Sequence, residues 1–386
     1  MNERAYFDWN ATTPLRAEAR AALVVALDSV GNASSVHSEG RNARRVIEQA
    51  REEVAALVGA SAQDVIFTSG ATEANILALT PYLEVVGEKR PRDRLFVSAI
   101  EHPSVLSGGR FAPEAVETLP VTADGVVNLA ALAAAIAKAE RPLVSVMLAN
   151  NETGVIQPIA EIARVVHAAN GLLHVDAVQG AGRIDCDMMA LGADLMSVSS
   201  HKLGGPQGVG ALICRGGIHI AAPLMTGGGQ ERRLRAGTEN VAGIAGFGAA
   251  CAAAAGARQA DAERMARLRD YFEAELKAIS PQVVIFGENA ARLPNTSLFA
   301  AAGVKAETAI ISFDLNGIAV SSGSACSSGK VQLSSVLIAM AVEPDLARGA
   351  VRVSVGWTST EADVDMLLNA WKRVSSSLLK KQADAA

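Results

Sequence analysis

The sequence has few cysteines, few aromatic residues and no long run of one charge sign. Its four cysteines form neither a C-x-x-C pair nor a zinc-ligand spacing, which is typical of free thiols in a reducing compartment and predicts no metal site. The net charge is -5 and no basic stripe carries interleaved aromatics, so a nucleic-acid partner is not expected. The motif G-x-x-x-x-G-K-[ST] is absent, which excludes a P-loop NTPase. The expected partner is therefore a small molecule or another protein.

The sequence features of secretion and membrane insertion are also missing. The N-terminal segment M-N-E-R-A-Y-F-D-W-N has neither a basic start nor an apolar run, so we expect no signal peptide and a cytoplasmic location. The longest uncharged stretch, residues 241–257, is short for a membrane span and consists mainly of alanine and glycine. We predict a helix packed inside a soluble protein there, and no membrane partner.

What the chain does have is enough apolar residues to bury a large core. It is 386 residues long, with 50% hydrophobic and 19% charged residues, which is typical of an ordered protein of about two domains. Short apolar runs alternate with polar turns and helical periodicity in the first half, which predicts a mostly parallel sheet covered on both faces. These runs are residues 65–68, 95–99, 143–148, 172–175 and 195–198.

The sequence pattern changes after residue 279. Helical patterns cover residues 48–59 and 261–279, and after the second of these the pattern changes to short strands, turns and a final helix. This change predicts a smaller α+β domain. Its expected elements are strands at 283–286, 308–313, 318–320 and 349–355 and a helix at 362–379.

Polar turns follow each of the five apolar runs. They read S-G-A-T-E-A-N, E-H-P-S, A-N-N-E-T-G, D-A-V-Q and S-S-H-K, in chain order. Ligands of open α/β sheets bind outside the carboxyl ends of the strands, so these turns are expected to converge on one site.

Two of the turns offer groups for an anionic ligand with a ring nitrogen. The free amides of Ala71 and Thr72 at a helix start suit a phosphate, although Thr72 could equally be an ordinary N-cap. Asp176 ends an apolar run, so it is either an anion for a protonated ring nitrogen or the acid of an N-cap or structural ion pair. Gln179 can reach the same space if the chain turns into a helix there.

Two further turns carry titratable groups. Most lysines are solvated, but Lys202 lies just past a strand end among small residues, where a partly desolvated amine can form a Schiff base. His102 provides a flat ring that is either structural or available for stacking. A phosphate cradle, an acid, a Schiff-base lysine and a stacking imidazole are together what pyridoxal phosphate requires.

Nine motifs in order then resemble the cysteine desulfurases of the class V aminotransferase family, pyridoxal-phosphate enzymes of fold type I. The motifs are D-W-N-A-T-T-P (8–14), G-N-A-S-S-V-H (31–37), T-S-G-A-T-E-A-N (68–75), E-H-P-S-V (101–105), A-N-N-E-T-G (149–154), H-V-D-A-V-Q (174–179), S-S-H-K-L-G-G-P-Q-G (199–208), R-A-G-T-E-N (235–240) and S-S-G-S-A-C-S-S-G (321–329). The resemblance implies an α/β large domain with a mostly parallel seven-stranded sheet between helices, over residues 15–258. It also implies a smaller α+β domain formed by residues 1–14 and 259–386.

The resemblance also implies a role for each site residue. Lys202 would carry the cofactor and move a proton, with His102 stacking on the ring and assisting as a second catalytic group. The substrate carboxylate would be bound by Asn151 and Arg352. The implied cofactor-binding set is Ala71, Thr72, His102, Asn151, Asp176, Gln179, Ser199, His201 and Lys202, with Thr238 contributed to the phosphate by the other subunit of a homodimer.

Cys326 matches the family's sulfur acceptor, which takes sulfur from L-cysteine as a persulfide and releases L-alanine. Its loop of small residues resembles the long-loop subgroup, in which this cysteine meets an iron-sulfur scaffold or another sulfur acceptor, and transiently its cluster. Departures from the family pattern are Trp9, Trp357 and K-V-Q-L at 330–333, and the short tail after the last helix favours the nitrogenase-associated type. The alternatives are a selenocysteine lyase or another class V enzyme, and a non-catalytic scaffold.

Overall fold

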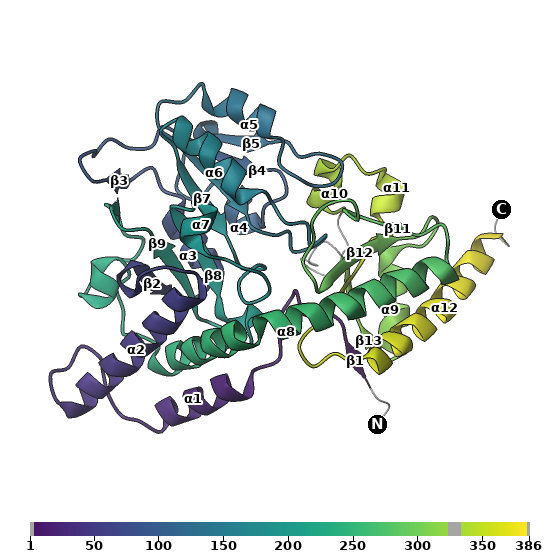
Figure 1. The fold of residues 1–386 in the computed structure, drawn as a ribbon, viewed down its shortest axis with the longest axis horizontal. Helices are drawn as coiled ribbons and strands as arrows, with labels where there is room; N and C mark the ends of the chain where they lie inside the picture. The colour runs from purple at the N-terminus through teal and green to yellow at the C-terminus, as the bar shows by residue number, and fades with distance from the viewer. Residues whose placement is uncertain (1–3, 323–332, 384–386) are drawn as a thin grey trace.

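The structure is a computed structural model that describes residues 4–322 and 333–383, and it is built around two sheets joined by one long helix (Figure 1). The larger sheet has seven strands. In spatial order these are β2 (Val65–Thr68), β9 (Gly210–Cys214), β8 (Leu195–Ser199), β7 (Leu172–Asp176), β6 (Pro142–Met147), β4 (Arg94–Ser98) and β5 (Val116–Leu119). Six of these strands run in the same direction, and β9 runs opposite to them. The predicted mostly parallel seven-stranded sheet is confirmed.

Helices cover both faces of this sheet because its strands are apolar on both faces. Successive residues of one strand point to opposite faces, so Val144 joins one buried cluster while Leu143 joins the other. The first cluster lies under α2 (Ser38–Leu57), α5 (Leu129–Ile136), α6 (Ile159–Ala168) and the start of α8 (Val241–Ile279), and the second lies under α3 (Ala71–Ala78) and α4 (Pro103–Leu106). This layering leaves the two ends of the sheet free of helices and open to ligands.

A smaller antiparallel sheet has its own core. Its order is β11 (Val284–Ile285), β12 (Thr296–Ala300), β15 (Val351–Ser354) and β14 (Ser321–Ser322), and β1 (Ala5–Tyr6) pairs separately with β13 (Ile318–Ala319). The helices α9 (Ala306–Leu315) and α12 (Glu361–Ala383) pack beside it. Trp371 is its largest buried side chain and meets Phe299 edge-on, with ring centroids 5.2 Å apart.

The helix α8 links the two sheets without a break, whereas the sequence suggested two helices. Its first half packs closely on α1 (Ala17–Leu27) and α2 because its residues are small, and a Cβ atom at Gly248 would lie 2.6 Å from the Cα of Ala50. Among the described residues it is the helix long and apolar enough to cross a membrane, but core helices pass the same test. The predicted domain boundary after residue 258 falls inside α8 and stays a prediction.

One predicted strand is wrong. Residues 308–313 read as a strand because they are apolar and partly β-branched, but they lie within helix α9. Ala306, Ala309 and Phe313 are buried while Ile311 is 63% exposed, a spacing of three and four residues that fits a helix and not a strand. The strands β5, β9 and β12 were not expected from the sequence.

The remaining elements are short and connect or flank the two sheets. They are the strands β3 (Leu83–Val85) and β10 (Ile218–Ile220), the α-helices α7 (Met188–Leu191), α10 (Ser335–Ala339) and α11 (Pro344–Ala347), and the 3-10 helices η1 (Ala62–Asp64), η2 (Pro113–Ala115), η3 (Ser200–Lys202) and η4 (Gln230–Arg233).

Candidate active site

The predicted site residues gather at the carboxyl ends of the strands of the large sheet. Asp176 is the last residue of β7 and Ser199 the last of β8, while His102 and Asn151 follow β4 and β6. The segment 8–13 crosses this end of the sheet and binds Lys202 and Gln179, and β15 of the small sheet adds Arg352. The expected convergence of the polar turns is thus present.

The turn before α3 has the form of an anion cradle. Gly70 is the N-cap of α3 with φ at 156°, and the helix start receives no hydrogen bond from a capping side chain. Thr72 is therefore not an N-cap residue, and the first amides of the helix are available to a phosphate. A Cβ atom at Gly70 would meet nothing within 4 Å, while one at Gly210 would lie 2.8 Å from the Cα of Gly70. The backbone of β9 thus packs behind the turn and leaves its other side open.

Asp176 is a buried carboxylate with neutral partners. It accepts hydrogen bonds from Nδ2 of Asn75 at 2.9 Å and from the amide of Val178 at 3.1 Å. No ion pair to it is present within the described residues. A buried carboxylate without a cation is stable only with several donors or with a charged ligand. Asp176 therefore fits the anion that holds a proton on a ring nitrogen.

Asn75 and Ser104 connect Asp176 to His102, and sequence reasoning assigned neither a role. Nδ2 of Asn75 donates to Oγ of Ser104 at 2.9 Å, and this oxygen lies 2.8 Å from Nδ1 of His102. Nδ1 also accepts from the amide of Ser104, so in the neutral ring the proton is on Nε2. Burial lowers the pKa of His102, with the charge of Lys202 acting in the same direction and that of Asp176 against it. A neutral, fixed imidazole suits stacking on a cofactor ring.

Lys202 ends the 3-10 helix η3, directly after β8. Its Nζ donates to the carbonyl oxygen of Asn10 at 2.5 Å and to that of Ala11 at 2.7 Å. Burial lowers the pKa of the amine to about 7, and the charges of Arg183 and Arg352 act in the same direction. A large fraction of Lys202 is therefore neutral near pH 7, which is the form that can react with an aldehyde.

Gln179 lies beside Lys202 at the segment 8–13, in a turn after β7 and not in the helix on which the sequence prediction depended. Its Nε2 donates to the carbonyl oxygen of Asn10 at 3.0 Å, and its Oε1 accepts from Nη1 of Arg183. Neither Asn10 nor Arg183 was singled out from the sequence. The only sequence signal was the presence of Asn10 in the motif D-W-N-A-T-T-P.

Arg352 is a buried guanidinium with one nitrogen, Nε, that has no hydrogen-bond partner among the described residues. Its Nη1 donates to the carbonyl oxygen of Asn151 at 2.9 Å and its Nη2 pairs with Asp8 at 2.7 Å, while its buried Nε has no hydrogen-bond partner. A buried donor without a partner is costly unless a ligand satisfies it. Arg352 thus suits a carboxylate, although Asp8 already holds one of its nitrogens.

The predicted site residues not yet described are His201, Thr238 and Cys326. His201 contacts Oγ1 of Thr12 through Nδ1 at 3.2 Å, and burial lowers its pKa to about 4. Thr238 is exposed in a loop that Arg235 ties to Glu73 of α3 at 2.9 Å. Cys326 lies outside the described residues.

These groups match the parts of pyridoxal phosphate one by one. The helix start of α3 suits the phosphate, the unpaired Asp176 suits the ring nitrogen, the amide of Gln179 suits the ring oxygen, and the desolvated Lys202 suits the aldehyde. With a mostly parallel seven-stranded sheet and a smaller antiparallel sheet, they define a pyridoxal-phosphate enzyme of fold type I.

Comparison with known proteins gives the particular family. The family model "Aminotransferase class-V" matches residues 5–367. "Cysteine desulfurase IscS" of Dictyoglomus turgidum is 40% identical over 382 residues, covering 98% of this chain and 96% of that protein. "IscS-like cysteine desulfurase" of Mycobacterium tuberculosis is 41% identical over 371 residues, covering 94% of each. The crystal structure of a NifS-like protein from Rickettsia africae superposes with a TM-score of 0.88 at 35% identity, covering 97% of this chain and 100% of that one.

The chain belongs to the class V aminotransferase family, and its cofactor is pyridoxal phosphate.

Proposed function

We propose that this protein is a cysteine desulfurase that releases L-alanine from L-cysteine and keeps the sulfur as a persulfide on Cys326. One observation carries the proposal, namely that three charged groups meet in one buried site. They are the amine of Lys202, whose pKa is about 7, the carboxylate of Asp176, which has no cationic partner among the described residues, and the guanidinium of Arg352, whose Nε has no hydrogen-bond partner among them. The named desulfurases among its relatives support the choice of substrate.

The chain's own residues divide the work around the cofactor. When bound, pyridoxal phosphate withdraws electrons from the substrate's α-carbon. Asp176 would keep the ring nitrogen protonated, because its hydrogen-bonded carboxylate has no cationic partner among the described residues. Lys202, neutral as the free amine, would hold the cofactor through its aldehyde carbon and would afterwards move a proton at the substrate carbon. His102, fixed by its contacts with Ser104, would cover the ring face.

Arg352 and Asn151 bind the substrate carboxylate. The unpartnered Nε of Arg352 supplies a donor that the carboxylate would satisfy, and the half-buried side chain of Asn151 lies beside it on the turn whose carbonyl Arg352 already binds. A charge-assisted bond of this kind fixes the substrate's orientation as well as its affinity.

Cys326 is the sulfur acceptor by comparison with the other three cysteines. Cys186, Cys214 and Cys251 are buried, and burial raises the pKa of each thiol, to about 12 for the first two. A thiol that stays protonated is a poor nucleophile. The Cys326 thiolate forms a bond to the substrate sulfur while the substrate carbon–sulfur bond breaks, and protonation of that carbon yields L-alanine.

The working form in this proposal is a cytoplasmic homodimer that passes sulfur to an iron-sulfur scaffold or another acceptor. Two observations support a second copy. Val25 and Leu27 of α1 are 68% and 65% exposed, which leaves apolar surface for an interface. Thr238, the residue expected to reach a phosphate, is exposed in its own chain.

The test measures alanine and sulfide formed from L-cysteine in the presence of a thiol reductant. Lys202→Ala and Cys326→Ala are both expected to abolish the activity, while Lys277→Ala, which removes only a surface ion pair, retains it. Persulfide is mapped by mass spectrometry after one turnover. Persulfide on one of the buried cysteines, or activity retained in Cys326→Ala, would contradict the acceptor assignment.

A further inference from the structure

Arg183 is a buried guanidinium bound only by neutral acceptors. Its Nη1 donates to Oδ1 of Asn10 at 3.1 Å and to the carbonyl oxygen of Gln179 at 3.2 Å, besides its bond to Oε1 of Gln179. Its Nη2 donates to the carbonyl oxygen of Trp9 at 3.3 Å. No carboxylate forms an ion pair with it among the described residues. Its positive charge is therefore not cancelled locally, and it acts on whatever lies beside it.

What lies beside it is the site, because Asn10 joins Arg183 to Lys202 and Gln179. The carbonyl oxygen of Asn10 accepts from Nζ of Lys202 at 2.5 Å and from Nε2 of Gln179 at 3.0 Å, while its side-chain oxygen binds Arg183. Asn10 is itself held on both sides, since its Nδ2 donates to Oγ1 of Thr296 at 2.9 Å and its amide to Oγ of Ser354 at 3.0 Å. Arg183 and Lys202 thus both bind Asn10, Arg183 at the side-chain oxygen and Lys202 at the carbonyl oxygen.

The same contacts fix the amide of Gln179. Its Oε1 faces the Arg183 guanidinium, which can only donate, so the Nε2 group must point the other way. One hydrogen of Nε2 goes to the carbonyl of Asn10 and the second is left to donate to a ligand oxygen. Without Arg183, only the contact of Nε2 with the carbonyl oxygen of Asn10 would fix the orientation of this amide.

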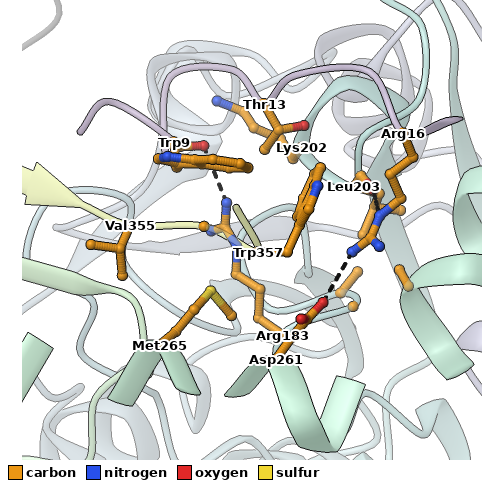
Figure 2. A pocket seen from close by; sticks show the side chains of 14 residues that line it. Trp9, Thr13, Arg16, Arg183, Lys202, Leu203, Asp261, Met265, Val355 and Trp357 are labelled. Atoms are coloured by element: carbon orange, nitrogen blue, oxygen red, sulfur yellow. Dashed lines mark hydrogen bonds and ion pairs between the residues drawn. The ribbon is translucent and has the colours of Figure 1, made fainter. Parts of the chain in front are cut away.

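Two tryptophans, Trp9 and Trp357, lie beside this group of charges. Trp9 and Trp357 pack edge to face with ring centroids 4.7 Å apart, and Gly356 is required between them because a Cβ atom there would lie 2.0 Å from the Trp9 ring. They line a pocket that Arg183 and Lys202 also line, as Figure 2 shows. Burial in the protein lowers the local dielectric, which strengthens the effect of Arg183 on its neighbours.

We propose that Arg183 is a positioning residue of the desulfurase site: its hydrogen bonds to Asn10 and Gln179 place its positive charge beside the Lys202 amine and orient the amide that faces the cofactor. The inference rests on the role of Lys202 given under the proposed function. Arg183 acts together with the other charged or titratable groups around the amine, which are Asp8, Asp176, Arg352, His102 and His201. Burial and the charge of Arg183 are the two largest causes of the low pKa of Lys202.

The experiment measures the proton affinity of Lys202 directly, without relying on turnover. The full-length chain, stripped of cofactor, is labelled with trace acetic anhydride across a pH series, and the peptide containing Lys202 is quantified by mass spectrometry. Arg183→Gln removes the charge, Arg183→Lys keeps it but loses the fork of hydrogen bonds, and Arg258→Gln removes a nearby surface pair as the matched control. Thermal melting of each variant shows that it is folded.

For Arg183→Gln, the labelling midpoint of Lys202 is expected to rise by about one pH unit, as expected when one neighbouring like charge is removed. Arg183→Lys is expected to keep the parent midpoint but to weaken cofactor binding about tenfold, because the amide of Gln179 is no longer fixed. The visible absorption band of the cofactor-bound proteins provides a second pH titration, with the same expected order. Arg258→Gln should match the parent in each measurement.

Three outcomes would overturn the proposal in different ways. An unchanged midpoint in Arg183→Gln would show that the charge does not act on Lys202. An equal rise of the labelling midpoint in Arg183→Gln and Arg183→Lys would show that the lost hydrogen bonds, and not the lost charge, change the pKa of Lys202. Borohydride reduction of the cofactor-bound parent, followed by peptide mapping, tests the underlying assignment separately: an adduct on a residue other than Lys202 would overturn the proposed function and this inference with it.

Discussion

Two buried aspartates at opposite ends of neighbouring strands have opposite surroundings. Asp194, just before β8, is paired with Arg215 at 2.5 Å and with His167 at 2.9 Å and accepts from the amide of Leu173 at 2.8 Å. Asp176, at the carboxyl end of β7, is bound only by a side-chain amide and a backbone amide. Asp194 therefore has a cationic partner within the protein, while Asp176 keeps its charge available for a ligand.

The difference shows how one sheet separates stability from chemistry. A buried carboxylate that is paired with cations contributes to holding the fold, and removing its partner leaves an uncompensated charge. A buried carboxylate without a cation gains its partner only when a ligand binds, so its charge serves recognition. The predictions below test this separation, from the largest expected effect to the smallest.

Exchanging each aspartate for asparagine gives the sharpest test. Asp176→Asn is expected to lower kcat/KM for L-cysteine by about a thousandfold, about 4 kcal/mol of lost transition-state stabilisation, because nothing then keeps the ring nitrogen protonated. Its free energy of unfolding without cofactor should change little. Asp194→Asn is expected to lose about 3 kcal/mol of stability while the folded fraction keeps its kcat. Steady-state kinetics and urea denaturation measure the two. Equal losses of activity in both variants would contradict the separation of stability from chemistry.

The rate of cofactor capture at the carboxyl end of the sheet should depend on pH through the protonation of Lys202. With a pKa of about 7, the amine is protonated below that pH and neutral above it, so cofactor capture by the apoprotein is expected to slow about tenfold per pH unit below 7 and to level off above 8. Stopped-flow absorbance after addition of pyridoxal phosphate follows this step. A plateau that begins only near pH 10 would show that Lys202 keeps its ordinary proton affinity.

A second copy of the chain should complete the carboxyl end and leave the amino end unaffected. Thr238→Val is expected to weaken cofactor binding about tenfold through the loss of one hydrogen bond to a charged group. Mixing this variant with Lys202→Ala, under conditions that exchange subunits, should restore one fully active site in each mixed dimer. Fluorescence titration and alanine release measure the recovery. No recovery on mixing would mean that Thr238 acts within its own chain or not at all.

The smallest effect is expected from Ser104, which only orients other groups. Ser104→Ala removes the link between Asn75 and His102, and a loss of about fivefold to tenfold in kcat with KM nearly unchanged is expected, in line with one net hydrogen bond. Ser107→Ala, one helical turn away with a single bond to a backbone carbonyl, is the control. A rise in KM without a fall in kcat would assign Ser104 to substrate binding.

Much of the fold could be predicted because its signal is local. Mostly apolar runs such as 143–148 and 195–198 match β6 and β8 within one residue at either end, since a strand buried on both faces has few polar positions. The antiparallel β9 was missed, and one of its two partners, β2, is distant in sequence. Residues 308–313 were wrong because a short apolar run fits either a strand or a helix until a neighbouring element selects one face.

The sequence by itself determined which chemical groups stand at the strand ends: Lys202, Asp176, His102 and the turn before Ala71 each lie in the turn that follows an apolar run. Only the tertiary structure decided how these groups are tuned. Asp8 and Arg352 pair across 344 residues, and Asn10 reaches Arg183 across 173. Hydrogen bonds and Coulomb interactions act over a few ångströms whatever the distance along the chain, so the proton affinity of Lys202 is a property of the folded protein.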